Sequence, residues 1–192
     1  TSGKYKYRNI EVPKGIRPTT EKVREAVFSM IMQWLPDAEV LDLFAGSGNL
    51  GLESWSRGAR LVQFVDNSRV SLRLTESNIQ KCRAEAECKV LKHDAEAAVD
   101  LLYKQGQRFD LVFVDPPYNK GWVQKILVKL EKNPILAESG WLVAEHSMHD
   151  DIAIAVSDGY EIFRRQQYGE TVLTFIRRKM PSQGLEDVSC NE

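Results

Sequence analysis

Hydrophobic residues recur along this chain in two alternating patterns. Short and almost wholly apolar runs, each of strand length, stand at residues 39–44 (EVLDLF), 61–66 (LVQFVD), 88–91, 110–114 (DLVFV) and 141–145. Several segments between them are longer, and their apolar residues return every three or four positions, as on one face of a helix. Buried strands that alternate with amphipathic helices predict a mostly parallel sheet with helices on both faces.

Four helices follow from this period and from their end signals. Thr20 is a candidate N-cap for a helix that runs to about Trp34, and Pro36 ends it. Further helices are predicted at 68–83, 95–104 and 122–132. The apolar positions that define three of the helical faces are Val23, Ala26, Val27, Met30 and Ile31; Val70, Leu72, Leu74 and Ile79; and Val123, Ile126, Leu127 and Leu130.

The chain closes on two further strand patterns, at 161–168 and 171–177, joined by a tight turn at Gly169. No helix separates them, which predicts an antiparallel strand at one edge of a seven-stranded α/β sheet of Rossmann-like type. We expect an N-terminal arm at 1–19, one domain at 20–179 and a disordered tail at 180–192, where Pro, Ser, Gly and acidic residues leave little to bury.

Composition fits one globular domain. Of 192 residues, 43% are apolar and 28% are charged, and no apolar run approaches the roughly 18 residues needed to span a bilayer. With no signal-peptide pattern at the start, we expect a cytoplasmic protein. The three cysteines, Cys82, Cys88 and Cys190, have no CxxC spacing, so we expect reduced thiols rather than disulfides or a zinc site.

Charge is distributed unevenly, although the net charge is only −1. Residues 1–24 hold seven basic and two acidic side chains, a balance of +5 that leaves −6 for the rest. Such an arm is suited to neutralising phosphates, with a merely solvated N-terminus as the alternative. The candidate substrate contacts are Lys4, Arg8, Arg17, Thr19, Thr20, Lys22 and Arg24.

A glycine loop follows the first predicted strand. Gly46, Gly48 and Gly51 form G-x-G-x-x-G, which lets the backbone turn tightly and approach a ligand. Asp66 ends the second strand 20 residues after Gly46, where its carboxylate could accept hydrogen bonds from ribose hydroxyls. The candidate cofactor contacts are Asp42, Phe44, Ala45, Gly46, Ser47, Gly48, Asp66, Asn67, Asp94 and Ala95.

The loop alone would also suit a dinucleotide. Asp42, at the end of the first strand, would repel a pyrophosphate but could face the ammonium group of S-adenosylmethionine. Asp94 follows the third strand on the same predicted rim, where it could accept from an adenine amino group. Asp94 also suits the N-cap of the helix at 95–104, and the two roles are compatible.

Asp115, Pro116, Pro117 and Tyr118 end the fourth strand and form the candidate catalytic motif DPPY. Prolines remove two backbone donors, so the segment presents acceptors: the Asp115 carboxylate and the Pro116 carbonyl could hold both hydrogens of an exocyclic base amine. Tyr118 could stack on the base. Methyl transfer would then be a direct in-line displacement without a covalent enzyme intermediate or a metal. A plain Pro-Pro turn is the alternative.

Taken together, these residues resemble the bacterial 16S rRNA guanine-N2 methyltransferases of the RsmD type over about residues 3–178. The matching segments are 3–8, 13–15 with 17–19, 23–28, 40–53, 56–59, 115–118 and 168–171. The resemblance implies a class I methyltransferase fold whose last strand is antiparallel. It also implies S-adenosylmethionine as cofactor with S-adenosylhomocysteine as product, and a monomer acting on 16S rRNA within assembling 30S particles.

Two other readings stay open. DPPY suits adenine N6 as well as guanine N2, and only the basic arm, with its Arg17-Pro18-Thr19 segment, separates them. A non-catalytic nucleotide-binding or RNA-binding domain would also account for the glycine loop. The chain departs from the family pattern at Asn49, where a small residue is common, and in its acidic tail after Lys179.

Overall fold

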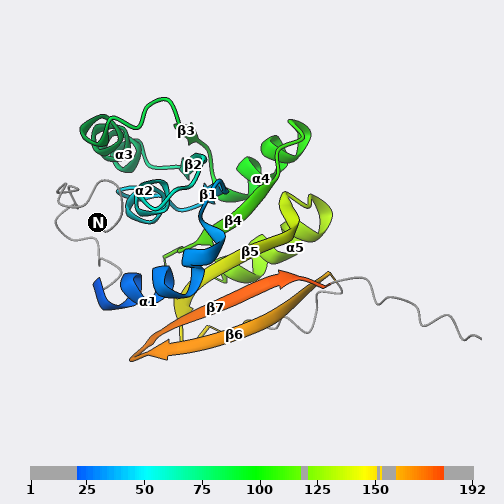
Figure 1. Cartoon of the computed structure of the whole chain (residues 1–192). Coiled ribbons are helices and arrows are strands. Elements are labelled where there is room, and N and C mark those ends of the chain that lie inside the picture. Colours follow the sequence, from blue (N-terminus) through cyan, green and yellow to red (C-terminus); the bar gives the residue numbers. More distant parts are fainter. Residues whose placement is uncertain (1–20, 118–120, 151, 153–158, 180–192) are drawn as a thin grey trace, which may run out of the picture.

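A computed structural model describes residues 21–117, 121–150, 152 and 159–179. The arm at 1–19 and the tail at 180–192 lie outside these ranges, so the predictions made for them stay predictions. The elements, drawn in Figure 1, are α1 (Glu21–Ile31), the 3-10 turn η1 (Met32–Trp34), β1 (Glu39–Asp42), α2 (Asn49–Ser56), β2 (Leu61–Asp66), α3 (Arg69–Cys82), β3 (Cys88–Lys92), α4 (Ala95–Lys104), β4 (Phe109–Val114), α5 (Trp122–Lys132), β5 (Leu136–Ser147), β6 (Tyr160–Tyr168) and β7 (Thr171–Arg178).

The seven strands form one sheet in the order β3-β2-β1-β4-β5-β7-β6, which confirms the predicted fold class. The first five strands pair in parallel, and β7 pairs antiparallel with both β5 and β6. β7 therefore stands one place in from the edge, and β6 is the edge strand. The turn at Gly169, with a φ of 62°, returns the chain beside β6, so β7 fills the place next to β5.

Two hydrophobic cores lie on opposite faces of the sheet. α1, α2 and α3 contribute to one core and α4 and α5 to the other, so helices cover both faces as predicted. The predicted face of α5 is buried at all four positions, and that of α3 is buried at Leu72 and Ile79. Val70 was wrong as a core position: it is 74% exposed, because it lies in the first turn of α3.

Strand ends differ from the sequence expectation in two places. The first strand ends at Asp42 instead of residue 44, because Leu43 donates to the Phe113 carbonyl and Ala45 to the Val65 carbonyl as the chain turns into the glycine loop. β5 begins at Leu136, earlier than predicted, and pairs with β4 across a register shift between Phe109 and Leu111. None of the helices in the described ranges is long and apolar enough to cross a membrane.

Candidate cofactor and acceptor site

Three predicted site carboxylates come from the carboxyl ends of neighbouring parallel strands. Asp42 is in register with Phe64 of β2 and with Phe113 of β4. Asp66 and Asp115 each lie two residues beyond those partners, so they flank Asp42 on the same rim of the sheet. Ligands of open α/β sheets bind at this rim. The predicted cofactor and acceptor motifs are therefore brought to one edge.

Asp66 holds the glycine loop in shape. Its Oδ2 accepts from the Gly46 N–H at 2.9 Å, and its Oδ1 accepts from the Ser68 N–H at 2.8 Å. Gly46 and Gly48 take positive φ values of 55° and 79°, a region that side chains other than glycine rarely adopt. Each Asp66 oxygen has a second lone pair, so the carboxylate can serve the loop and still accept from a ligand.

α3 supports the same loop through two polar residues that the sequence reasoning missed. Thr75 Oγ1 donates to the Gly46 carbonyl at 3.0 Å, and Asn78 Nδ2 donates to the Ser47 carbonyl at 3.0 Å. Both side chains are fully buried. Their spacing of three residues on the buried face of α3 was the signal available, since buried polar side chains need a hydrogen-bond partner.

The third glycine of the motif sets the packing of α2 on the sheet. A Cβ built at Gly51 would lie 2.2 Å from the Phe64 ring, so no other residue fits there. At Gly48 a Cβ would lie 3.0 Å from the Thr75 side chain. Because α2 packs closely on β2, the loop that precedes α2 is held in one conformation. The N–H groups of the loop therefore keep one orientation.

Asp42 is the most deeply buried of the three rim carboxylates. It is 1% exposed, and its Oδ2 accepts from the Gly51 N–H at 3.2 Å, while Oδ1 has no hydrogen-bond partner among the described residues. Burial raises the pKa of Asp42 to about 7, the Gly51 N–H opposes that rise, and the charge of Asp66 adds to it. A buried carboxylate with one unpaired oxygen fits the ammonium group of S-adenosylmethionine.

Asp94 has the capping role that the sequence also allowed. Its Oδ1 accepts from the Ala97 N–H at 3.0 Å, at the N-terminus of α4, and its side chain is exposed. Ala95 is buried below it, and Asn67 is exposed beside β2. The cap is compatible with a second contact to an adenine amino group, which stays a prediction.

The acceptor motif is described up to Pro117. Asp115 is half-buried, Pro116 is buried and Pro117 is exposed, so the segment turns outward directly after β4. Tyr118 lies outside the described residues, and its stacking role stays a prediction. The prolines lack N–H groups, which leaves the carbonyls and the Asp115 carboxylate as the polar groups of this turn.

An aromatic contact joins the two halves of the rim. Phe44 of the glycine loop meets Trp122, the first residue of α5, edge to face at 5.8 Å between ring centroids. Lys125 Nζ lies 4.7 Å from the centroid of the Trp122 ring. Trp122 is half-buried. It thus links the segment after DPPY to the cofactor loop, a contact that its apolar character alone did not reveal.

Most of the predicted substrate contacts lie outside the described residues: Lys4, Arg8, Arg17, Thr19, Thr20 and the side chain of Lys22. Arg24, in the first turns of α1, is half-buried. A groove of about 660 Å³ lies away from this rim, at the amino ends of β1 and β4, and Trp34, Asp110 and Trp141 are among its lining residues.

Sequence comparison finds relatives along nearly the whole chain. A family model described as "Conserved hypothetical protein 95" matches residues 1–177. The Bacillus subtilis protein named "Putative rRNA methyltransferase YlbH" is 33% identical over 180 residues, 93% of this chain and 97% of that protein. The Escherichia coli K12 protein named "Ribosomal RNA small subunit methyltransferase D" is 30% identical over 183 residues, 88% of this chain and 90% of that protein.

Solved structures share the fold. The "Putative methyltransferase yhhF" of Escherichia coli superposes with a TM-score of 0.81 at 29% identity, covering 93% of this chain and 96% of its own. The structure of SMU.776, described as a putative methyltransferase complexed with SAH, superposes with a TM-score of 0.64 at 16% identity, over 79% of this chain and 49% of its own. The second likeness concerns the fold alone.

Proposed function

Because this chain belongs to the Conserved hypothetical protein 95 family of S-adenosylmethionine-dependent methyltransferases, we propose that it methylates the exocyclic N2 of a guanine in 16S rRNA. The observation that carries the proposal is the register that sets Asp42, Asp66 and Asp115 side by side on one rim. The rRNA substrate class follows the names of the relatives. Within 16S rRNA, we propose guanine 966 as the target nucleotide.

The β1–β2 half of the rim would hold the cofactor. Asp42 offers a buried, unpaired carboxylate oxygen for the ammonium group, and the glycine loop offers backbone close enough for a ligand to approach. Asp66 would accept from the ribose hydroxyls and Asp94 from the adenine amino group. The other proposed cofactor contacts lie in the same loops: Phe44, Ala45 and Ser47 in the glycine loop, Asn67 after Asp66 and Ala95 after Asp94. When bound, S-adenosylmethionine supplies an electrophilic methyl group on a sulfonium sulfur.

The β4 half would hold the base. Asp115 and the Pro116 carbonyl would accept the two hydrogens of the guanine amino group, and Pro117 and Tyr118 would bound the base. Holding both hydrogens would orient the nitrogen lone pair toward the bound methyl donor. Transfer would form the carbon–nitrogen bond, break the carbon–sulfur bond of the donor and leave S-adenosylhomocysteine. The extra amine proton passes to solvent or to the Asp115 carboxylate.

The basic arm would supply phosphate contacts, with Lys4, Arg8, Arg17, Lys22 and Arg24 as the cations and Thr19 and Thr20 beside them. α1 begins at Glu21, so the arm joins the described part of the chain at the end of the sheet where β7 begins (Figure 1). We further propose that the chain acts as a monomer in the cytoplasm, on 16S rRNA within assembling 30S particles.

Transfer of labelled methyl groups tests the proposal. Purified protein and S-adenosylmethionine labelled in the methyl group are incubated with 30S particles from a strain lacking the endogenous activity. We expect label in the RNA fraction and none in a parallel reaction with duplex DNA. Label in ribosomal proteins alone would reject an RNA methyltransferase.

The remaining alternatives have their own discriminators. A non-catalytic domain would bind nucleotides without transferring a methyl group. Titration calorimetry compares S-adenosylmethionine with NAD: the proposed enzyme should bind S-adenosylmethionine in preference to NAD, because Asp42 disfavours a pyrophosphate. An adenine-N6 enzyme would transfer methyl groups to RNA but yield a different nucleoside.

A further inference from the structure

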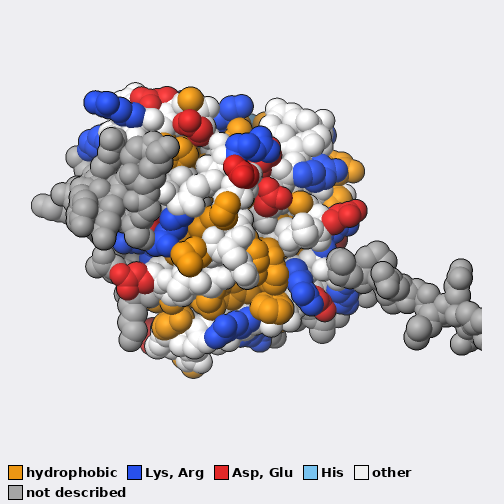
Figure 2. All heavy atoms as spheres, viewed as in Figure 1, with side chains coloured by type: hydrophobic (Ala, Val, Ile, Leu, Met, Phe, Trp, Pro, Cys, Tyr) orange, Lys and Arg blue, Asp and Glu red, His pale blue; other side chains and the backbone are white. Residues whose placement is uncertain are grey.

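An exposed surface on the α1 side of the sheet combines aromatic rings with arginines, away from the catalytic rim. We call it the aromatic–arginine face and define it as Trp34, Trp141, Phe163, Arg164 and Arg177. Figure 2 shows hydrophobic side chains gathered over the end of α1, β5 and β7, with basic side chains along two borders. Neither the cofactor site nor the acceptor site uses these residues.

The rings form one continuous cluster. Trp34 and Trp141 stack with their centroids 3.9 Å apart and their planes 7° from parallel. The Phe163 ring meets Trp141 edge to face at 5.0 Å. The Arg177 guanidinium lies 5.2 Å from the Phe163 centroid and 6.0 Å from that of Trp141. Rings and guanidinium planes together are a stacking surface for nucleobases.

A bulge in the edge strand exposes Phe163. Ile162 pairs with Ile176 and Arg164 pairs with Phe175, so Phe163 is an extra residue without a partner in the ladder. A bulge re-aims side chains at a strand edge, and Phe163 is 54% exposed as a result. Arg164, next to it, is also exposed. The strand therefore presents a ring and a cation to solvent at one point.

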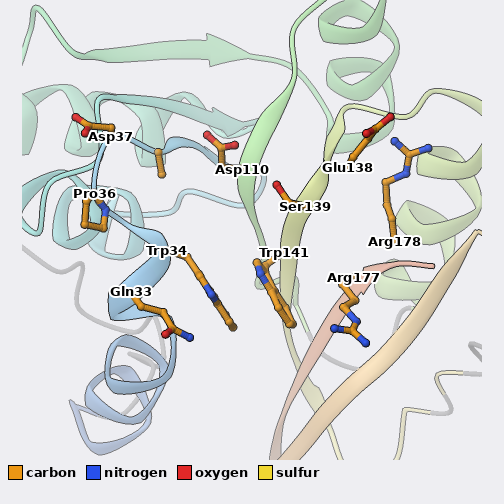
Figure 3. A pocket seen from close by; sticks show the side chains of 11 residues that line it. Gln33, Trp34, Pro36, Asp37, Asp110, Glu138, Ser139, Trp141, Arg177 and Arg178 are labelled. Atoms are coloured by element: carbon orange, nitrogen blue, oxygen red, sulfur yellow. The ribbon is translucent and has the colours of Figure 1, made fainter. Parts of the chain in front are cut away.

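Charge on this hairpin favours an anionic partner. Of the four arginines in residues 160–178, Arg164 pairs with Phe175 and Arg177 pairs with Trp141, so these two lie on this face. Glu161 accepts from Arg177 Nε at 2.6 Å and thereby fixes the guanidinium against the rings. Figure 3 shows Asp37 and Asp110 across the groove from Arg177, and Arg178 pointing away from Arg177 toward Glu138, so we expect phosphates on the Arg177 side.

The face is continuous with the catalytic rim through β6. This strand runs from Tyr160 to Tyr168, Tyr168 pairs with Thr171, and Thr171 pairs with Ser147 at the carboxyl end of β5. The five steps along the strand from Phe163 to Tyr168 span about 17 Å at the usual rise of a strand. A few unpaired nucleotides cover such a length.

We propose that the aromatic–arginine face binds the single-stranded RNA that flanks the target nucleotide, with bases on Phe163 and phosphates on Arg164 and Arg177. This inference rests on the proposed function, because it requires an RNA substrate. Stacking on a ring is indifferent to base identity, so the face adds affinity and fixes the path of the strand while the acceptor site selects the nucleotide.

The test measures binding and turnover of the full chain. Filter binding with end-labelled 16S rRNA transcript at several salt concentrations compares wild type with Phe163→Ala, Phe163→Trp and Arg164→Gln. We expect Phe163→Ala to weaken binding about tenfold without changing the salt dependence, and Phe163→Trp to restore it. Arg164→Gln should lower the slope of log K against log salt by about 0.7, the value for one phosphate contact of a single strand.

A matched control lies on α4 and the loop after it. Arg108 lies 5.3 Å from the centroid of the Tyr103 ring, and both side chains are exposed, so Tyr103→Ala with Arg108→Gln removes a similar pair from another surface. Binding should stay at the wild-type level in that control. On 30S particles, the Phe163→Ala defect should appear in KM while kcat holds.

Three results would count against the face as an RNA site. Phe163→Ala and Arg164→Gln behaving like the control would overturn it outright. Weakened binding to 30S particles with unchanged binding to the bare transcript would assign the face to a protein partner, and loss of self-association would assign it to a second copy. If wild type transfers no methyl group to RNA at all, the proposed function itself fails, and the two failures are thereby distinguished.

Discussion

The two halves of the catalytic rim are built in different ways. On the cofactor half, hydrogen bonds between residues far apart in sequence hold the loop: Asp66 binds Gly46, Thr75 binds the Gly46 carbonyl, and Asn78 binds the Ser47 carbonyl. On the acceptor half, the polar geometry comes from one contiguous segment, Asp115 to Pro117, in which proline fixes the backbone. The first half depends on the fold, and the second depends largely on its own covalent structure.

This difference predicts which mutations change turnover and which change cofactor affinity. A change on the acceptor half should affect turnover and leave cofactor affinity intact, because no backbone of the glycine loop relies on it. A change on the cofactor half should affect affinity in proportion to how directly the residue meets the ligand. Phe44 and Trp122 are the point at which the halves touch.

The largest effect is expected from Asp115→Ala. Loss of the acceptor for the base amine should lower kcat by about 100- to 1,000-fold, the range found when one preorganised polar group is removed from a transition state. Calorimetry should give an unchanged Kd for S-adenosylmethionine. Asp110→Asn, at the other end of the same strand, is the matched control and should keep its kcat. A large loss of cofactor affinity in Asp115→Ala would assign that residue to the cofactor half.

Asp42→Asn should affect cofactor affinity and stability in opposite directions. Removing the buried partner of the ammonium group should raise Kd by about 30-fold or more. The free protein should melt several degrees higher at pH 8, because the amide removes the cost of a buried charge while an acceptor for the Gly51 N–H remains. Calorimetry and thermal unfolding give the two values. A lower melting temperature with unchanged Kd would contradict the role of Asp42.

The pH dependence of stability and of cofactor affinity in the wild-type protein tests the same role of Asp42. The folded pKa of Asp42, about 7, lies above its ordinary value of 3.8, so the native state holds a proton that the unfolded state releases between these values. Stability should therefore fall as pH rises from about 4 to about 7. Cofactor affinity should rise over the upper part of that window, since the ammonium pairs with the ionised form. Both trends should vanish in Asp42→Asn.

Thr75→Val should have the smallest effect. It leaves the buried Gly46 carbonyl without its side-chain donor, a loss of about 1 kcal/mol, or about fivefold in cofactor affinity, with kcat unchanged. Thr75→Ser keeps the hydroxyl and should bind like wild type. If both variants bind equally well, the hydrogen bond from α3 does not position the loop.

Local patterns predicted the fold well, and they placed the glycine loop and the segment 115–117 directly after β1 and β4, while the roles given to their residues stay predictions. The glycine loop, Asp66 at its distance of 20 residues and the segment 115–117 each depend on residues near one another in sequence, and the family membership is confirmed. Thr75 and Asn78 were missed because the helical period was read from apolar residues alone. Val70 was misplaced because the helical period does not show that the first turn of α3 is exposed.

Strand order and long-range pairs were beyond local reasoning. Nothing near Gly169 indicates that β7 lies between β5 and β6, since a hairpin can join a sheet by either strand. The stack of Trp34 on Trp141 joins residues 107 positions apart, and the Phe163 bulge depends on a register that only the folded sheet defines. The aromatic–arginine face could therefore be recognised only in the structure.

The identity of the methylated nucleoside separates guanine-N2 methylation from adenine-N6 methylation. 30S particles lacking the modification are incubated with the protein and S-adenosylmethionine, and the 16S rRNA is digested to nucleosides and analysed by mass spectrometry. We expect one new product, N2-methylguanosine, which is absent with Asp115→Ala. N6-methyladenosine as the product, or no methylated nucleoside at all, would contradict guanine-N2 methylation.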